Sequence, residues 1–370
     1  MTKTVLVTGA DGFLGRNLIQ HLKNKPEFCV REVGRRTSNQ ELRKSVRGCD
    51  AVVHLAGVNR SSQVSEFESV NVRFTKELLE VLENHGTPPI FFASSTQAII
   101  DSPYGRSKKD AELIISAYGN RNGVTARIAR LPNVFGKWSR PNYNSVVATF
   151  AFNIIRNLPI RVDNPDEVLE ILYVDDLVRA IIHDLSRGFT DPSFKLNPIY
   201  RITVGDLAKT LIEMHRKRRS GAVLEVGEGI HRALYATYVS FLEPSSFSYP
   251  LDQHKDERGL FVEFIKTVSS GQVSFFTAKP GVTRGSHFHH TKVEKFIVTH
   301  GAARFQFQNL LDGTIHYVDV SADTPVVVES VPGWIHSVTN LGNEDLSVLV
   351  WASEVFNPHK TDTFGEVIEH

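Results

Sequence analysis

The stretch Thr8-Gly9-Ala10-Asp11-Gly12-Phe13-Leu14-Gly15 decides the fold of the N-terminal half, because it joins an apolar strand pattern, Lys3–Thr8, to a helical pattern. Gly9 permits a tight turn, and Gly12 lets the backbone approach a pyrophosphate. Gly15 lets the helix pack closely on the strand. A glycine turn in this context predicts a dinucleotide-binding site. The residues that we expect to contact the cofactor here are Gly9, Asp11, Gly12, Phe13, Leu14 and Gly15.

Short apolar runs alternate with helical patterns through the first half of the chain. This alternation is typical of a parallel sheet wound by helices. We therefore expect an α/β fold with a Rossmann-like, doubly wound parallel sheet. The expected strands are Lys3–Thr8, Phe28–Val33, Ala51–Leu55, Ile90–Ser94 and Thr125–Leu131, and the expected helices are Phe13–Asn24 and Phe67–Glu83.

The sequence changes character near Pro244, where short β-rich runs begin. Turn signals separate these runs at Pro280-Gly281, Asp312-Gly313 and Pro332-Gly333. The pattern predicts an all-β domain, built as a barrel. We accordingly expect two domains, 1–243 and 244–370.

The bulk composition excludes several classes of function. The 370 residues carry a formal net charge of +1 with both signs mixed, which predicts no nucleic-acid or membrane surface. The two cysteines are too few for a disulfide framework and fit a reducing compartment. No apolar stretch reaches the ~18 residues that span a bilayer, and a strand so near the N-terminus leaves no room for a signal peptide. We expect a soluble, cytoplasmic protein.

The expected strand Phe28–Val33 leads into the segment that carries the cofactor preference. An enzyme that uses NAD tends to end this strand with an acidic residue, which binds the ribose hydroxyls. Here Gly34-Arg35-Arg36-Thr37-Ser38 follows, with no carboxylate after Glu32. Arg35 and Arg36 offer the positive charge that a 2′-phosphate requires, so the segment predicts NADPH.

A tyrosine and a lysine stand four residues apart in Tyr104-Gly105-Arg106-Ser107-Lys108 and therefore share one face of a helix. An ammonium group beside a phenol lowers the pKa of the phenol, which can then pass a proton at neutral pH. Ser94, Ser95 and Thr96 end the preceding strand, and one of their hydroxyls can reach the same carbonyl oxygen. The pattern predicts reduction of a carbonyl group.

The N-terminal part resembles the extended short-chain dehydrogenase/reductase family, which acts on nucleotide sugars. Besides the glycine turn and the tyrosine–lysine pair, Asp50–Gly57, Asn133–Gly136 and Tyr173–Asp176 carry the resemblance. One departure is the short spacing of nine residues between Ser95 and Tyr104, where the family has a longer insertion. The resemblance implies catalytic roles for Tyr104 as proton donor, Lys108 as its tuner and Ser95 as hydrogen-bond donor, cofactor contacts at Leu55 and Ala56, and a substrate contact at Asn133.

The C-terminal half contains a pattern typical of a metal site, His287-Phe288-His289-His290-Thr291-Lys292-Val293-Glu294. Two histidines that are two residues apart on a strand point to one face. The glutamate then precedes an apolar run, Phe296–Val298, which predicts the returning strand. Imidazoles and a carboxylate suit zinc, or iron, manganese or nickel. His290 would face the opposite side unless the strand is bulged, and it stays a rival ligand.

This half resembles the cupins, through the histidine pattern and through Pro332-Gly333-Trp334-Ile335-His336-Ser337-Val338-Thr339-Asn340. The resemblance implies a barrel that holds one divalent metal, for which we expect zinc. The second cupin motif usually has a residue between its proline and glycine, which this chain lacks. The implied metal ligands are His287, His289, Glu294 and His336.

Two further segments, Asp256–Glu263 and Arg284–His287, resemble those of nucleotide-linked 4-keto-sugar 3,5-epimerases. In that family the histidine after Arg-Gly removes a proton α to the ketone, and arginines hold the substrate. The resemblance therefore implies that His287 is a general base, which conflicts with its role as a ligand, and the sequence leaves both open. The implied substrate-binding residues are Arg258 and Arg284, and Lys255 is another candidate base.

The order of the parts, a reductase and then a metal-bearing, epimerase-like cupin, resembles that of bifunctional enzymes of capsular-polysaccharide synthesis. The resemblance implies a UDP-linked 2-acetamido-2,6-dideoxy-4-keto-L-hexose as substrate. Its C3 would be inverted in the cupin and its C4 ketone reduced with NADPH, giving UDP-N-acetyl-6-deoxy-L-talosamine. Because a 4-ketone acidifies the C3–H bond, epimerisation must precede reduction. We also expect a homodimer, since small cupins commonly bury a sheet edge by pairing.

Two other functions remain open from the sequence. The cupin-like part could be a metal-stabilised dimerisation module beside a simple reductase. The N-terminal part could instead be a nucleotide-sensing regulator, although the pair Tyr104 and Lys108 argues against it.

Overall fold

In the computed structural model of the chain, residues 2–218, 223–250, 254–256, 259–261, 265, 271–354 and 361–365 are described. Arg258 and the side chain of Lys255 lie outside the described residues. The chain forms two compact units, 1–145 with 169–201, and 146–168 with 202–370. The predicted boundary after residue 243 falls inside the second unit and stays a prediction. No helix of the described part is long and apolar enough to cross a membrane.

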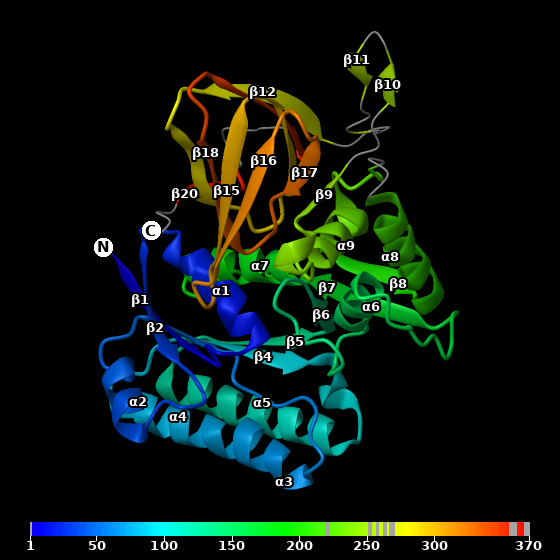
Figure 1. Cartoon of the computed structure of the whole chain (residues 1–370). Helices are drawn as coiled ribbons and strands as arrows, with labels where there is room; N and C mark the ends of the chain where they lie inside the picture. The colour runs from blue at the N-terminus through cyan, green and yellow to red at the C-terminus, as the bar shows by residue number, and fades with distance from the viewer. Residues whose placement is uncertain are drawn as a thin grey trace. The chain divides into compact units, whose positions relative to one another are not determined.

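The first unit is built on a five-stranded parallel sheet with strand order β2-β1-β3-β4-β5. Helices α2, α4 and α5 cover one face of this sheet, and α1 and α7 cover the other (Figure 1). The predicted doubly wound, Rossmann-like sheet is therefore confirmed. The elements are β1 (Lys3–Thr8), α1 (Phe13–Lys23), β2 (Phe28–Val33), α2 (Asn39–Val46), β3 (Ala51–His54), α3 (Val64–Phe67), α4 (Phe74–Glu83), β4 (Ile90–Ser95), α5 (Pro103–Asn122), β5 (Ala126–Leu131), β6 (Asn133–Phe135), β7 (Val168–Tyr173), α7 (Val174–Ser186) and β8 (Ile199–Thr203).

One part of the core of this unit lies between the sheet and the helices α4 and α5. Leu6, Val52 and Phe92 project from three strands and are 0–1% exposed, and they pack with Leu78 of α4 and Tyr118 of α5. Because helices cover both faces, the central strands are continuous apolar runs rather than alternating ones. This is why the central strand β1 has the bounds that the sequence predicts. The bounds of the edge strand β2 also match, although its sequence mixes apolar and charged residues.

The predicted helix 67–83 differs from the structure in two ways. It begins earlier, at Val64, and it contains a π-helical stretch, Glu68–Arg73, between α3 and α4. In that stretch Asn71 is buried and bonds the backbone of Val58, accepting from its N–H at 2.8 Å and donating to its carbonyl at 2.9 Å. A buried amide with fixed partners thus holds the loop after β3 against the helix.

The second unit contains two five-stranded antiparallel sheets, with strand orders β12-β19-β14-β17-β9 and β16-β15-β18-β13-β20. The β-rich character that the sequence predicts is confirmed. The glycines of the three predicted turns, Gly281, Gly313 and Gly333, have φ of 72°, 72° and 87°, which favours glycine. The elements are α6 (Val146–Ile155), α8 (Val204–Arg218), α9 (Gly229–Val239), β9 (Ser248–Pro250), β10 (His254–Asp256), β11 (Gly259–Phe261), β12 (Gln272–Ala278), β13 (Thr283–Phe288), β14 (Glu294–His300), β15 (Ala302–Asn309), β16 (Ile315–Ser321), β17 (Val326–Glu329), β18 (Trp334–Asn340), β19 (Leu346–Ala352) and β20 (Phe364–Gly365).

Candidate functional site

A cleft of about 670 Å³ opens in the first unit at the carboxyl ends of the parallel strands, where ligands bind in folds of this kind. Its lining joins the predicted cofactor and catalytic residues from separate parts of the chain. Ala56 and Arg36 are the two predicted contacts that do not line it. The predicted residues that do are Gly9, Asp11, Gly12, Phe13, Leu14, Gly15, Arg35, Leu55, Ser95, Tyr104, Lys108 and Asn133.

The glycine turn has the geometry that its sequence predicts. Gly9 has φ +70°, and a Cβ on it would lie 2.7 Å from the Ala56 nitrogen. A Cβ on Gly15 would lie 2.2 Å from the Gly9 carbonyl oxygen, so only glycine lets α1 start this close to β1. The N-terminus of α1 is thereby left facing the cleft, with backbone N–H groups available for a pyrophosphate.

The end of β2 carries Arg35 into the cleft. Asp11 holds this segment, because its Oδ2 accepts a hydrogen bond from the Arg35 backbone N–H at 3.0 Å. A Cβ on Gly34 would lie 2.1 Å from the same carboxylate oxygen, so a larger residue there would displace the Asp11 carboxylate. Of the two predicted arginines, Arg35 lines the cleft and Arg36 is exposed outside it.

Tyr104 and Ser95 meet in the cleft despite the short segment between them. Ser95 ends β4, and Tyr104 lies in the first turn of α5, whose N-cap Ser102 accepts from the Gly105 N–H at 3.0 Å. Burial raises the pKa of Tyr104, and a hydrogen bond with Ser95 lowers it, with a net rise. The direction differs from the sequence prediction, in which Lys108 lowers this pKa. The phenol is consequently protonated at neutral pH.

The structure separates the three candidate hydroxyls by what each one contacts. The Ser94 hydroxyl donates to Glu112 Oε1 at 2.5 Å, and Glu112 also pairs with Arg130. Ser95 bonds Tyr104, while Thr96 is exposed. Of the three, Ser95 is therefore the one whose hydroxyl contacts Tyr104.

Lys108 lines the inner wall of the cleft and is 5% exposed. Its Nζ donates to the Ala93 carbonyl at 2.6 Å and lies 4.2 Å from the centroid of the Phe92 ring. Burial lowers the pKa of Lys108 to about 7. Lys108 is therefore a buried residue of α5, and its ammonium group is fixed by the hydrogen bond to the Ala93 carbonyl of β4.

Other residues of the cleft carry no local sequence signal. Trp138, Arg140 and Tyr143 line it from the segment after β6. The Tyr143 hydroxyl donates to the Arg60 carbonyl at 2.8 Å, and the Arg60 guanidinium donates to the Tyr143 carbonyl. This reciprocal contact joins two loops that are distant in sequence, which no short motif could reveal.

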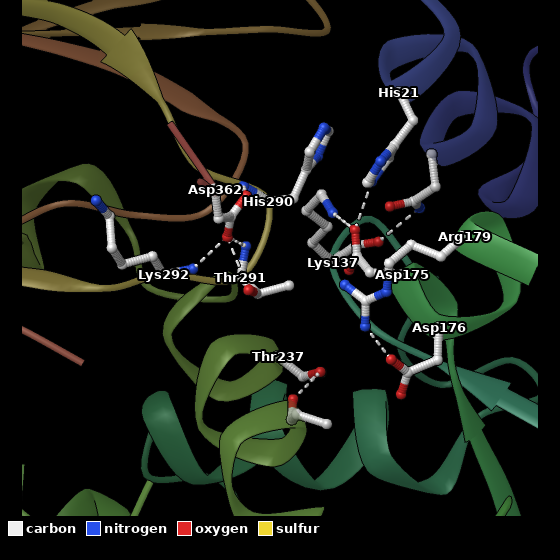
Figure 2. Close-up of polar contacts among 12 residues, drawn as sticks. His21, Lys137, Asp175, Asp176, Arg179, Thr237, His290, Thr291, Lys292 and Asp362 are labelled. Carbon is white, nitrogen blue, oxygen red and sulfur yellow. Dashed lines mark hydrogen bonds and ion pairs between the residues drawn. The ribbon is translucent and has the colours of Figure 1, made fainter. Parts of the chain in front are cut away.

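The segment Tyr173–Asp176 supports the cleft rather than lining it. Asp175 Oδ1 lies 2.7 Å from Lys137 Nζ and 2.7 Å from His21 Nε2 (Figure 2). Asp175 and Lys137 are 0% and 1% exposed. These contacts join α7 to α1 through His21 and to Lys137. Lys137 directly precedes Trp138, which lines the cleft.

In the second unit, His287, His289, Glu294 and His336 converge. Each offers one ligand atom, and the four atoms lie within 4.8 Å of one another. Glu294 Oε2 is 3.1 Å from His289 Nε2 and 3.2 Å from His336 Nε2. We call these four residues the histidine–glutamate cluster. The structure thus brings together the four residues that the sequence predicts as metal ligands.

Both antiparallel sheets contribute to this cluster. His287 on β13 pairs directly with His336 on β18, while Glu294 opens β14 in the other sheet. A β-bulge between Gly285 and His287, with φ of +98° at Gly285, reorients the end of β13. The strand stops at Phe288, so His289 lies in the following loop and not, as expected, on the strand.

The protonation states in the cluster fit a metal site. Burial lowers the pKa of His287 to about 3, with His336 and His289 adding to the effect, and burial also lowers the pKa of His336. Burial raises the pKa of Glu294, but His289 and His336 outweigh it, and the net pKa lies well below its ordinary value. At neutral pH, neutral His287 and His336 surround an ionised carboxylate, which are the forms that bind metals.

Two predicted residues lie apart from the cluster. The His290 ring packs against Phe288 and Phe364, with ring centroids 5.3 and 5.0 Å away, and it is outside the group of four ligand atoms. Arg284 is exposed, and its guanidinium donates to the Thr277 carbonyl at 3.0 Å.

Comparison with known proteins agrees with this architecture. The family described as the NAD dependent epimerase/dehydratase family matches residues 5–196, and the family described as the polysaccharide biosynthesis C-terminal domain matches residues 254–364. The chain therefore belongs to the NAD dependent epimerase/dehydratase family and carries a polysaccharide biosynthesis C-terminal domain.

Among individual proteins, the chain is 46% identical over 363 residues to a Pseudomonas aeruginosa protein named UDP-2-acetamido-2,6-beta-L-arabino-hexul-4-ose reductase, covering 98% of each chain. It is similar to the crystal structure of the capsular polysaccharide assembling protein CapF from Staphylococcus aureus, with 36% identity, a TM-score of 0.66, and 98% and 100% of the two chains covered. The predicted resemblance to enzymes of capsular-polysaccharide synthesis is confirmed. UDP-glucuronic acid 4-epimerase from Bacillus cereus, at 19% identity and a TM-score of 0.51 over 58% of this chain and 84% of that one, shares the fold.

Proposed function

We propose that the chain reduces the C4 ketone of a UDP-linked 2-acetamido-2,6-dideoxy-4-keto-L-hexose with NADPH, in the synthesis of a capsular polysaccharide. The observation that carries the proposal is the meeting of Tyr104, Ser95 and Lys108 with the glycine turn on one cleft. The names of the Pseudomonas aeruginosa and Staphylococcus aureus relatives support the substrate and the process.

In this mechanism Tyr104 donates a proton to the C4 oxygen. The glycine turn would hold NADPH, which would supply the hydride that C4 accepts. The raised pKa keeps the phenol protonated until the oxygen develops charge. Ser95 Oγ accepts from the Gln97 N–H at 3.1 Å, which leaves its own hydrogen to donate to the same oxygen. The protonated form of Lys108, whose pKa is lowered to about 7, carries a positive charge that would favour the phenolate once the proton has left.

The tyrosine can be tested in the full chain. Replacing Tyr104 with phenylalanine should lower ketone reduction by ~10²–10⁴-fold, which is typical of a lost general acid, while NADPH binding persists. Tyr143→Phe removes another phenol of the same cleft and should cost less than about tenfold, as one hydrogen bond is lost. Near-normal reduction by Tyr104→Phe would remove this residue from the mechanism.

For the β-rich part we propose a cupin barrel whose histidine–glutamate cluster holds one zinc ion. Three imidazoles and one carboxylate suit zinc, and the protonation states described above support binding. When bound, the metal would cross-link the two sheets, because its ligands come from both of them. We assign it a structural role.

We further propose that the β-rich part inverts C3 before C4 is reduced, so that the product is UDP-N-acetyl-6-deoxy-L-talosamine. The 4-ketone stabilises the enolate that forms when the C3 proton is removed, and this stabilisation is lost after reduction. The proposed base is His287, or Lys255 if His287 stays bound to the metal. The arginines proposed to hold the substrate are Arg258 and Arg284.

Hydrogen exchange at C3 tests this second activity without the first. The full chain, given the 4-keto sugar in heavy water without NADPH, should incorporate deuterium at C3. The variant Tyr104→Phe should keep this exchange while it loses reduction. Absence of exchange in the full chain would leave a simple reductase whose β-rich part is a non-catalytic, metal-stabilised dimerisation module.

A further inference from the structure

Asp362 lies in the short described segment 361–365 and binds the loop between β13 and β14. Its carboxylate accepts hydrogen bonds from three consecutive backbone N–H groups, those of His290 at 2.9 Å, Thr291 at 2.7 Å and Lys292 at 2.8 Å (Figure 2). The Thr291 hydroxyl donates to the same carboxylate at 2.7 Å. One side chain therefore satisfies four donors of a loop that runs from His289 to Glu294.

The backbone of the same residue acts on the cluster directly. The Asp362 carbonyl oxygen lies 2.5 Å from His289 Nδ1. A carbonyl can only accept, so Nδ1 carries the hydrogen, and in the neutral ring Nε2 presents a lone pair. That lone pair faces Glu294 Oε2 at 3.1 Å. In the neutral ring both atoms are acceptors and repel each other at this distance, so a metal ion or a proton must lie between them.

The segment is also fixed to the strand that carries the first histidine. β20 pairs with β13, with Gly365 opposite His287 and Phe364 opposite Phe288. The rings of Phe364 and Phe288 stack with centroids 5.5 Å apart. The position of Asp362 is thereby set relative to both histidines of the H-x-H pair.

We propose that Asp362 is a positioning residue of the metal centre. Its carboxylate holds the loop that carries His289 to Glu294, and its carbonyl selects the ring form of His289 that can bind a metal. This inference rests on the metal site proposed above. Residues that orient metal ligands in this way contribute strongly to metal affinity.

The isosteric substitution Asp362→Asn separates charge from shape. Asparagine keeps the backbone carbonyl that contacts His289. Its side chain, however, has an NH₂ group in place of one carboxylate oxygen, and this group cannot accept hydrogen bonds from the backbone N–H groups of the loop. A matched control is Asp312→Asn, because Asp312 also accepts a backbone N–H, that of Thr314 at 2.9 Å, in a turn of the same β-rich part. A milder variant, Thr291→Val, leaves the Asp362 carboxylate intact and removes the hydroxyl that donates to it. The same hydroxyl also contacts Glu354 and Arg232.

The test measures Zn²⁺ affinity of the full-length variants by competition with a chromogenic chelator, and ligand geometry from the visible spectrum after Co²⁺ substitution. We expect Asp362→Asn to bind Zn²⁺ about 10–100-fold more weakly with an altered Co²⁺ spectrum. Thr291→Val should bind about two- to tenfold more weakly, because one of the four hydrogen bonds to the Asp362 carboxylate is lost. Asp312→Asn should match the unmodified chain.

Unchanged Zn²⁺ affinity in Asp362→Asn would overturn the proposal, even if the melting temperature of the metal-free chain falls, because the residue would then only stabilise the loop. If Asp362→Asn does not fold, unchanged affinity in Thr291→Val overturns it instead. A chain that binds no Zn²⁺ without any substitution would overturn the metal centre itself and this role with it.

Discussion

At the scale of single residues, neighbours in sequence have different chemistry because their side chains meet different partners. Ser94 and Ser95 are adjacent, yet the first donates to Glu112 and the second bonds Tyr104. Arg35 and Arg36 are adjacent, and only the first lines the cleft. Since successive residues at a strand end point to opposite sides, a motif of two like residues leaves the functional one undecided until the sheet is formed.

The arginines can therefore be tested one at a time. Arg35→Ala should weaken NADPH binding at least about tenfold, because a charge-assisted contact to the 2′-phosphate is lost. Binding of NADH, which lacks that phosphate, should change little. Arg36→Ala is the matched control and should bind both cofactors as the unmodified chain does. Equal weakening of NADPH and NADH by Arg35→Ala, measured by fluorescence titration, would contradict this assignment.

At the scale of elements, successive side chains of β14 point to opposite faces of the sheet and enter two different polar groups. Glu294 belongs to the histidine–glutamate cluster, whereas Lys295 donates to Glu329 Oε1 on β17 at 2.6 Å. The Arg218 Nε of α8 donates to Glu329 Oε2 at 2.6 Å, and the Lys295 ammonium donates to the Tyr249 hydroxyl at 2.7 Å. The three charged residues are 0–4% exposed. This buried network fixes the strand that carries Glu294.

Glu329→Gln should lower the free energy of unfolding at pH 7 by roughly 3–5 kcal/mol, the usual cost of breaking a buried ion pair. Arg218 and Lys295 would lose their counter-charge. Burial raises the pKa of Glu329, but these two cations outweigh it and the net pKa lies below 4.5. The stabilisation is therefore complete above pH 4.5 and is lost as the pH falls through the lowered value.

Urea unfolding of both proteins at pH 7 and at pH 3 measures this difference, which should shrink in acid. Asp319→Asn breaks the exposed pair with Arg304, whose atoms are 2.7 Å apart, and should have a much smaller effect, because solvent screens such pairs. Glu329→Gln and Asp319→Asn with equal effects at pH 7 would show that the buried network does not stabilise the fold.

At the scale of the whole molecule, the second compact unit joins helices of the middle of the chain to the β-rich part. Arg218 at the end of α8 donates to the Ser246 carbonyl at 2.5 Å as well as to Glu329. The Tyr249 hydroxyl in turn donates to the Arg218 carbonyl at 2.8 Å. The sequence predicts a domain boundary after residue 243. The hydrogen bonds of Arg218 with Ser246, Tyr249 and Glu329 cross this boundary, because Arg218 precedes it and its three partners follow it.

Two fragments distinguish these boundaries. A fragment of residues 202–370 keeps Arg218, whereas a fragment of residues 244–370 leaves Glu329 with Lys295 as its remaining cation in the network. We expect the shorter fragment to unfold at a lower temperature, because Glu329 loses one of its two cationic hydrogen-bond partners. Equal melting temperatures of the metal-loaded fragments, measured by circular dichroism, would support an independent domain that begins at 244.

Sequence by itself determined the features that depend on a few consecutive residues. The bounds of β1 follow from a continuous apolar run, and the turn at Gly9 follows from the space that a Cβ would need. The four residues of the histidine–glutamate cluster were found because two short motifs carry them. In each case the physical cause, periodicity or local sterics, acts within about one turn or strand.

The tertiary structure decided what depends on partners distant along the chain. In the folded chain Ser95 contacts Tyr104, whereas Ser94 donates to Glu112. The pKa of Tyr104 is raised and not lowered as expected, because burial outweighs the hydrogen bond. It excluded His290 from the cluster, since β13 bulges and ends at Phe288. It also brought Asp362, more than seventy residues away in sequence, to His289. Desolvation and long-range hydrogen bonds arise only when the chain is folded, so no local pattern encodes them.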